Sequence, residues 1–249
     1  MGDCFIMESS DKFKVSVITT LFNYRDYVKD AIVSFLEQDF YKSEMIIVDD
    51  ASTDSPYEVI KDFEEDRIRY LHLGENMGYS YAKNAGIKMS TADVLVMLDA
   101  DDLLTKNSIS VRYKKLMKGY DFVHGPCLDF KQGRELVRNR MWELWKKEKT
   151  YKYVHAQGVM LKKKIHSEIG LYDESLRSKS DREFFARVFN YNYKVGVVKQ
   201  DVALYRRHKR QMHRSKEKAK TNDKLQEEVM KKIAKRKTNL SDLTFLDRK

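Results

Sequence analysis

A run of five apolar residues followed directly by a cluster of carboxylates constrains the fold of this chain most strongly. Residues 94–98 (VLVML) contain no polar side chain, a pattern typical of a β-strand buried on both faces of a sheet. Asp99, Asp101 and Asp102 follow within four residues. Because adjacent like charges repel, this turn needs a divalent cation or a helix N-terminus to stabilise it. A helix cap uses one carboxylate, so the cluster favours a metal held by Asp99 and Asp101.

Strand-like runs alternate with segments of helical periodicity around this stretch. The sequence predicts strands at 14–20, 44–48, 68–73 and 94–98, and helices at 27–37, 57–64, 79–89 and 107–117. This alternation favours right-handed βαβ crossovers and a mainly parallel sheet. Thr20, Asp49, Asp50 and Asp99 all lie at the ends of predicted strands. Open α/β sheets bind ligands at the carboxyl ends of their strands, so we expect these residues to meet in one site.

The second half of the chain has a less regular pattern. It predicts strands at 121–127, 154–161, 194–198 and 202–205, and an amphipathic helix at 181–189. Ser180 is placed to cap this helix, and Asp181 in its first turn faces the positive end of the helix dipole. Residues 128–150 are basic and contain tryptophan, and no element is predicted for them.

The excess positive charge lies in one segment near the C-terminus. Residues 206–237 hold 14 lysines and arginines against four acids, a surplus that equals the formal net charge of +10. The rest of the chain is therefore neutral. Residues 215–237 predict a basic helix with Leu225, Val229 and Ile233 as its apolar stripe. Such a helix suits an anionic membrane surface, a nucleic-acid backbone or simply solvent.

Cysteine usage and hydropathy bear on the cellular location. Cys4 and Cys127 lack metal-ligand spacing and are expected to be reduced thiols. No segment approaches the length of an apolar membrane span, and the N-terminus lacks the pattern of a signal peptide. We expect a cytoplasmic protein. A peripheral position at the inner face of a membrane is compatible with this location.

Seven segments, taken in order, resemble the family 2 glycosyltransferases, and the resemblance covers about residues 15–212. The segments are VSVITTLFN at 15–23, IIVDDASTD at 46–54, NMGYSYAKNAGI at 76–87, VLVMLDADD at 94–102, GLYDE at 170–174, SDREFFAR at 180–187 and YRRH at 205–208. The resemblance implies the GT-A fold, a Rossmann-like, mainly parallel sheet flanked by helices, here with a basic C-terminal helical extension. It also implies an inverting, metal-dependent hexosyl- or pentosyltransferase that uses a nucleotide sugar.

The same resemblance suggests how the chain is organised. We expect an N-terminal lead at 1–13 and a nucleotide-sugar-binding half at 14–127. Residues 128–213 would form the acceptor-binding half of the same domain, followed by a basic helical tail at 214–249.

The resemblance assigns donor-binding roles residue by residue. Asp50 would accept a hydrogen bond from the uracil imide N–H, with Thr20 beside the base. Asp99 would contact the ribose or the water shell of the metal. Lys83, where the family often has arginine, would lie beside the diphosphate, and the alternative is a solvated helix lysine.

The metal roles fall on two residues. Asp101 would hold the Mn²⁺ or Mg²⁺ ion that bridges the diphosphate oxygens. His208 would bind the metal or the diphosphate, and the alternative is a solvated histidine in a basic stretch.

On the acceptor side, Asp181 matches the general base of the family. A sugar hydroxyl is a poor nucleophile, so its proton must leave as it attacks the anomeric carbon. The alternative for Asp181 is a second capping residue beside Ser180, which stands where the family frequently has glutamate. His155, Gln157 and Glu183 are further candidates for the acceptor side. Glu183 and Arg187 are also spaced to pair with each other on a helix.

These assignments predict transfer of a sugar from a UDP-sugar to the hydroxyl of a saccharide or a lipid-linked glycan. One alternative is transfer to a hydroxymethylated base in DNA, as in bacteriophage DNA modification, with the basic tail on the phosphate backbone. Another is a non-catalytic nucleotide-sugar-binding protein. The presence of Asp50, Asp99, Asp101 and Asp181 together disfavours the latter.

Overall fold

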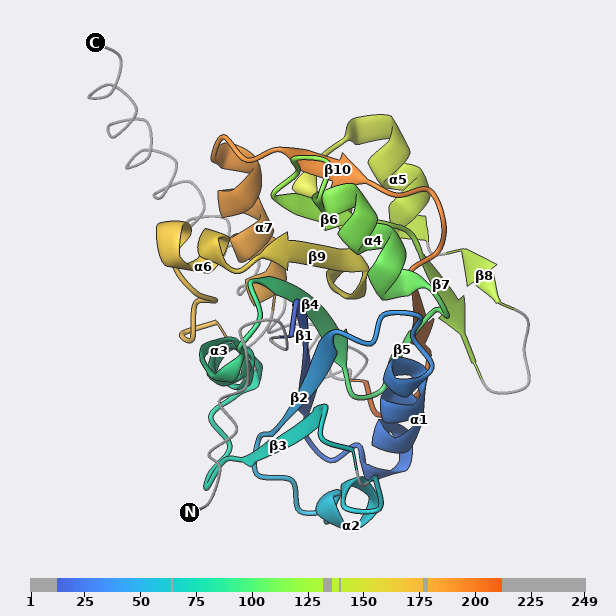
Figure 1. Ribbon diagram of the computed structural model, residues 1–249, viewed down its shortest axis with the longest axis vertical. Coiled ribbons are helices and arrows are strands. Elements are labelled where there is room, and N and C mark those ends of the chain that lie inside the picture. The colour runs from blue at the N-terminus through green and yellow to red at the C-terminus, as the bar shows by residue number, and fades with distance from the viewer. Residues whose placement is uncertain (1–12, 64, 132–135, 139, 177–178, 212–249) are drawn as a thin grey trace, which may run out of the picture.

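A seven-stranded mixed sheet forms the centre of the molecule (Figure 1). The computed structural model describes residues 13–211 apart from 64, 132–135, 139 and 177–178. The strand order is β10-β6-β9-β4-β1-β2-β3. The strands are β1 Val15–Leu21, β2 Ser43–Asp49, β3 Ile68–His72, β4 Val94–Asp99, β6 Phe122–His124, β9 Val159–Lys162 and β10 Val195–Val197. All pairs are parallel except those of β9 with β4 and β6, so the predicted mainly parallel sheet is confirmed.

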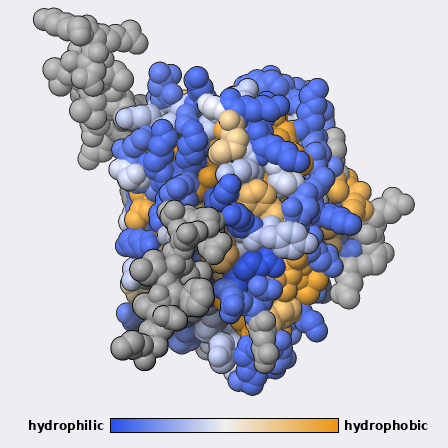
Figure 2. All heavy atoms as spheres, viewed as in Figure 1, coloured by the Kyte–Doolittle hydropathy of each residue, from blue (hydrophilic) through white to orange (hydrophobic). Residues whose placement is uncertain are grey.

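Helices cover both faces of this sheet (Figure 1). They are α1 Arg25–Leu36, α2 Tyr57–Ile60, α3 Tyr79–Met89, α4 Ser108–Leu116, α5 Arg140–Glu148, α6 Lys164–Ile169 and α7 Ser180–Asn190. The alternating side chains of the strands build one core with α1, α2 and α4, and a second core with α3, α5, α6 and α7. Outside these cores the surface is largely hydrophilic, with scattered apolar areas (Figure 2).

A second, four-stranded sheet joins the C-terminal part of the described chain to the acidic turn. Its order is β5-β11-β7-β8, with β5 at Leu103–Leu104, β7 at Cys127–Phe130, β8 at Val137–Arg138 and β11 at Ala203–Arg206. Because β5 directly follows the carboxylate cluster and pairs with β11, residues 203–208 lie next to that cluster.

Several predicted elements differ from those observed. The strand predicted at 121–127 is divided into β6 and β7 around Gly125 and Pro126, and Pro126 has no N–H for a ladder. Within the strand predicted at 154–161, a short 3₁₀ turn forms at Ala156–Gly158, and the observed strand begins only at Val159. The region 128–150, which had no predicted element, contains β7, β8 and α5. The basic helix predicted at 215–237 lies outside the described residues.

The capping predicted for Ser180 is wrong. Ser180 is the first residue of α7, and the N-cap is Lys179 in the left-handed conformation with φ of 60°. The buried Ser180 hydroxyl has no hydrogen-bond partner among the described residues.

No described helix has the length and apolarity needed to cross a membrane.

Candidate functional site

The acidic turn after β4 gathers three carboxylates into a small volume. Asp99, Asp101 and Asp102 each offer an oxygen, and these atoms lie within 4.8 Å of one another. Burial and the neighbouring carboxylates raise the pKa of Asp102 well above its usual range, and burial raises the pKa of Asp99 to about 6. A bound cation would reverse this penalty, so the cluster is chemically suited to a divalent metal.

The capping interpretation of this cluster is wrong. The N-cap of α4 is Asn107, whose side chain makes no capping hydrogen bond, and the N–H of Ile109 in the first turn donates to Gln38 Oε1 at 3.1 Å. Asp102 instead accepts the backbone N–H of Arg206 at 2.8 Å through Oδ1. Its buried Oδ2 has no hydrogen-bond partner in the described part of the chain. Asp102 thus belongs to the acidic cluster, although the sequence pattern did not assign it to the metal.

Asp99 is held by donors from three different elements. Thr20 Oγ1 donates to Oδ1 at 3.2 Å, because parallel pairing of β1 and β4 places these residues in register. The Tyr79 hydroxyl donates to the same oxygen at 3.0 Å. Gln157 Nε2 donates to Asp99 Oδ2 at 2.5 Å, and Gln157 Oε1 accepts the Asp99 backbone N–H at 3.2 Å. The structure therefore brings Gln157, predicted on the acceptor side, to Asp99.

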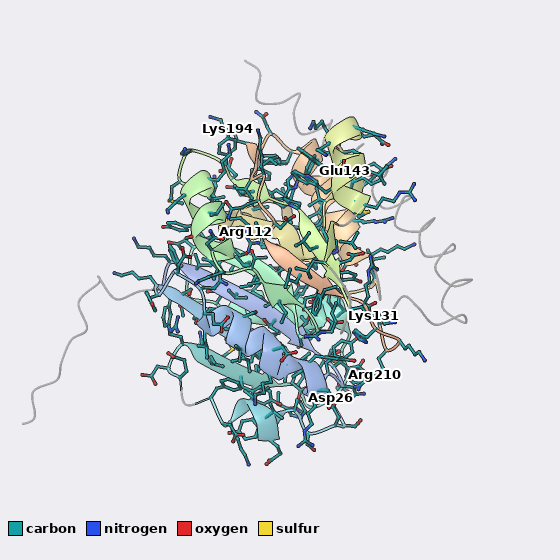
Figure 3. The ribbon with its side chains drawn as sticks, turned by 90° about the vertical axis from the view of Figure 1, so that its right-hand side faces the viewer. Asp26, Arg112, Lys131, Glu143, Lys194 and Arg210 are labelled. Carbon is teal, nitrogen blue, oxygen red and sulfur yellow. The ribbon has the colours of Figure 1, made fainter. Side chains whose placement is uncertain are left out.

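Gln157 is itself supported by a buried arginine. Arg112 on α4 lies inside the fold (Figure 3) and is fully buried. Its guanidinium donates to the carbonyls of Val159 at 2.9 Å and Gln157 at 3.5 Å, and to Ser108. Burial lowers the pKa of Arg112 to about 10. Arg112 was not among the predicted site residues, because an arginine in a helix pattern is most simply a surface residue.

Asp50 anchors the turn that precedes α3. Its Oδ1 accepts the N–H of Met77 at 2.7 Å and its Oδ2 accepts the N–H of Gly78 at 2.9 Å. Gly78 has φ of 93°, a conformation that favours glycine. Burial nevertheless raises the pKa of Asp50. These two bonds fix the segment that leads into α3.

Lys83 and Asp181 meet across the site. Lys83 is fully buried on α3, and its Nζ donates to Asp181 Oδ1 at 2.6 Å. The Asp181 side chain is 21% exposed. The solvated-lysine alternative is therefore wrong.

His208 lies against the acidic cluster. Its Nε2 is 2.9 Å from Asp101 Oδ2, and its ring packs against Tyr24 and Tyr27. Arg206 donates to the Asp101 carbonyl at 2.8 Å. The side chain of His208 is 10% exposed, so the solvated-histidine alternative is wrong.

The segment that carries His208 is fixed to the start of α1. Arg210 and Asp26 lie side by side (Figure 3), and the Arg210 guanidinium donates to Asp26 Oδ2 at 3.0 Å. The Tyr24 hydroxyl donates to the Arg210 carbonyl at 3.3 Å.

The two remaining predicted residues differ in accessibility. His155 is half-buried and its ring contacts that of Tyr205 edge to face. Glu183 is fully buried and accepts from the Arg187 guanidinium at 2.9 to 3.2 Å. The predicted pairing of Glu183 with Arg187 is confirmed, and its burial gives Glu183 a structural role.

Carboxylates lie at the strand ends of a Rossmann-like sheet, and α3 links them to a further carboxylate on α7. This arrangement is that of the nucleotide-sugar-dependent transferases that the sequence resembles. Residues 16–228 match the family described as Glycosyl transferase family 2. This chain belongs to that family.

Known proteins agree with this assignment. The chain is 35% identical over 123 residues to GalNAc(5)-diNAcBac-PP-undecaprenol beta-1,3-glucosyltransferase of Campylobacter jejuni, covering 48% of this chain and 40% of that protein. Curated relatives such as this one are matched over about two fifths of their own length.

Two solved structures share the fold. TarS of S. aureus in complex with UDP has a TM-score of 0.70 at 20% identity, covering 89% of this chain and 64% of that one. Mannosyltransferase PcManGT of Pyrobaculum calidifontis, in complex with GDP-Man and Mn²⁺, has a TM-score of 0.67 at 18% identity, covering 81% and 59%. The GT-A fold expected from the sequence is thereby confirmed.

Proposed function

We propose that this protein transfers a sugar from a UDP-sugar to a hydroxyl group of a glycan or lipid-linked glycan, with inversion at the anomeric carbon. The observation that carries the proposal is that α3 links the carboxylate cluster at the end of β4 to Asp181 at the start of α7. Tyr79 on this helix binds Asp99, and Lys83 on the same helix binds Asp181. UDP in the S. aureus structure supports the donor, and the undecaprenol-linked substrate named for the Campylobacter relative supports the acceptor class.

The donor would lie along the carboxyl edge of β1, β2 and β4. Asp50 would accept the uracil imide N–H, because an ionised carboxylate is an acceptor only and keeps lone pairs beyond those used by Met77 and Gly78. Thr20 would lie beside the base. Asp99, already held by three side-chain donors, would use its remaining acceptor capacity for the ribose.

Asp101 and His208 would hold the metal, with Asp102 Oδ2 close by. The residues fit a hard divalent cation, since they offer carboxylate oxygens and one imidazole. When bound, Mn²⁺ or Mg²⁺ would neutralise charge on the diphosphate leaving group, a contribution of several kcal/mol.

Asp181 would act as the general base. Its partly exposed carboxylate would take the proton of the acceptor hydroxyl as the hydroxyl oxygen bonds to the anomeric carbon. The bond from that carbon to the diphosphate oxygen breaks on the opposite side, which inverts the configuration. His155 would line the acceptor side.

A lipid-linked acceptor would bring the protein to the inner face of a membrane. The DNA alternative depended on the basic tail, which lies outside the described residues, and no contact among the described residues favours it.

The test combines donor binding with loss of the base. A UDP-sugar at 100 times its dissociation constant should add ~2.7 kcal/mol of stability in a thermal-shift screen with Mn²⁺. Asp181→Asn should retain UDP binding and lose ~10²–10⁴-fold in UDP release from the UDP-sugar. Unchanged release would remove Asp181 from the mechanism.

A further inference from the structure

Lys83 has an environment unlike that of an ordinary helix lysine. Its ammonium lies 4.1 Å from the centre of the Tyr79 ring and 5.1 Å from that of Tyr172, and the side chain is fully buried. A buried ammonium is costly unless it is paired, and aromatic faces compensate for only part of the lost hydration. Within the described residues, Asp181 is its only ion-pair partner, at 2.6 Å.

Both helices of this pair are fixed to the same connecting segment. On α3, Asn84 Nδ2 donates to the Tyr172 carbonyl at 2.9 Å, and Asn84 Oδ1 accepts the Tyr172 N–H at 3.0 Å. Ser80 donates to the Leu176 carbonyl at 2.9 Å. On α7, Arg187 donates to the carbonyls of Ile169, Gly170 and Leu171. These hydrogen bonds therefore set the distance between α3 and α7 at which Lys83 meets Asp181.

The close packing of α3 on the sheet fixes the distance between α3 and β1. A Cβ on Gly86 would lie 2.5 Å from Ile18 Cγ2, so α3 approaches β1 at a distance that only glycine allows. The Tyr79 hydroxyl, one turn before Lys83, binds Asp99 at 3.0 Å. A single helix thus contacts the acidic turn through Tyr79 and Asp181 through Lys83.

We propose that Lys83 is a positioning residue for Asp181: it binds Oδ1 and thereby directs Oδ2 toward the acceptor hydroxyl. Oδ2 of Asp181 has no hydrogen-bond donor among the described residues. This inference rests on the proposed function, since it needs Asp181 to be the base. It departs from the expectation that Lys83 serves the diphosphate, because the ammonium is already enclosed by Tyr79, Tyr172 and Asp181.

The experiment separates the two roles by measuring binding and turnover in the same variants. Lys83→Met keeps the length of the side chain and removes the charge, Lys83→Arg restores a cation, and Lys88→Met changes an exposed lysine on the same helix as the control. UDP affinity is measured by calorimetry with Mn²⁺. Turnover is measured as UDP release from UDP-GlcNAc, UDP-glucose and UDP-galactose, with p-nitrophenyl glycosides or water as the acceptor.

A positioning role predicts a split between affinity and rate. Lys83→Met should leave the UDP dissociation constant within about twofold and lower kcat by about 10²-fold, the loss expected when a reacting group is misplaced by about 1 Å. Lys83→Arg should recover part of the rate. In the Asp181→Asn background, Lys83→Met should cause no further loss, because the group it positions is already absent.

Two results would overturn the inference. An increase of tenfold or more in the UDP dissociation constant of Lys83→Met would assign the ammonium to the diphosphate. A full additional loss in the double variant would show that Lys83 acts independently of Asp181. The proposed function fails separately, if Asp181→Asn alone leaves UDP release unchanged. A crystal structure of the wild-type complex with UDP and Mn²⁺ distinguishes the two roles without turnover, because it shows whether Lys83 Nζ contacts Asp181 or the diphosphate.

Discussion

The donor side of the site, defined by Thr20, Asp50, Asp99 and Asp101, is positioned by the sheet, whereas Asp181 on the acceptor side is positioned by side chains. Thr20 lies opposite Asp99 because β1 and β4 pair in parallel register. Asp181 takes its place through Lys83 and through the bonds of Arg187 and Asn84 to the segment before α7. Backbone ladders survive most single substitutions. A position that depends on a few side chains does not, so the two sides should respond differently to mutation.

The largest effect is expected on the donor side, at the proposed metal ligand. Asp101→Asn removes the charge that would hold the cation, and several kcal/mol of charge stabilisation correspond to a loss of roughly 10³-fold in transfer. Metal-dependent UDP release measures this. Asp62→Asn, at an exposed position, is the control. Retention of full Mn²⁺-dependent activity in Asp101→Asn would exclude Asp101 as a ligand.

The next largest effect is expected on stability, at Arg187, which fixes α7 on the acceptor side. Arg187→Met leaves Glu183 buried without its partner and frees three backbone carbonyls, which should lower the free energy of unfolding by about 3 kcal/mol. Urea unfolding measures the change, with the exposed Arg182→Met on the same helix as the control. A change below about 0.5 kcal/mol, the range typical of surface substitutions, would contradict the claim that the acceptor side is positioned by side-chain bonds such as those of Arg187.

A smaller effect should follow at Gln157, a side chain of the acceptor half that binds Asp99 on the donor side. Gln157→Leu removes both hydrogen bonds to Asp99 while keeping an apolar body of similar size. A hydrogen bond to a charged group contributes ~1.5 kcal/mol or more, so UDP affinity should fall about tenfold by calorimetry. Equal affinity would mean that Thr20 and Tyr79 are sufficient to orient Asp99.

The smallest effect is a dependence of stability on pH. The folded protein holds a proton on Asp99 up to a pKa of about 6, above the usual value of 3.8. Folding therefore takes up a proton between these values, and stability should fall as pH rises from about 4 to about 6, by about 1 kcal/mol because the side chain is partly exposed. Asp99→Asn should flatten this part of the curve in urea unfolding without metal. If the stability of the wild type rose between about pH 4 and about pH 6 and that of Asp99→Asn did not, the prediction of a raised pKa at Asp99 would be contradicted.

The same contrast explains what the sequence could predict. Thr20, Asp50, Asp99 and Asp101 lie at or shortly after the ends of predicted strands, and the rules of parallel sheets place strand ends together. The partners of side chains on helices and irregular turns do not follow from such rules. No pattern in the sequence directs Tyr79 or Gln157 to Asp99, because that contact depends on the rotation of α3 and on 3₁₀ turns where a strand was predicted.

Ser180 and Lys83 show why the role of a single residue is hard to predict from its type and spacing. Ser180 has the residue type of a cap, yet the backbone places Lys179 at the N-cap. Lys83 has the spacing of a helix residue in a polar segment, and its burial depends on Tyr172, some ninety residues later in the chain.

The most direct test of the two-sided site is the position of a bound metal. Crystals of Asp181→Asn grown with UDP and Mn²⁺ would give an anomalous difference peak for manganese. The prediction is a peak between Asp101 and His208, with the uracil on Asp50 and the diphosphate directed toward residue 181. A manganese peak away from Asp101, or a uracil bound elsewhere than at Asp50, would contradict it.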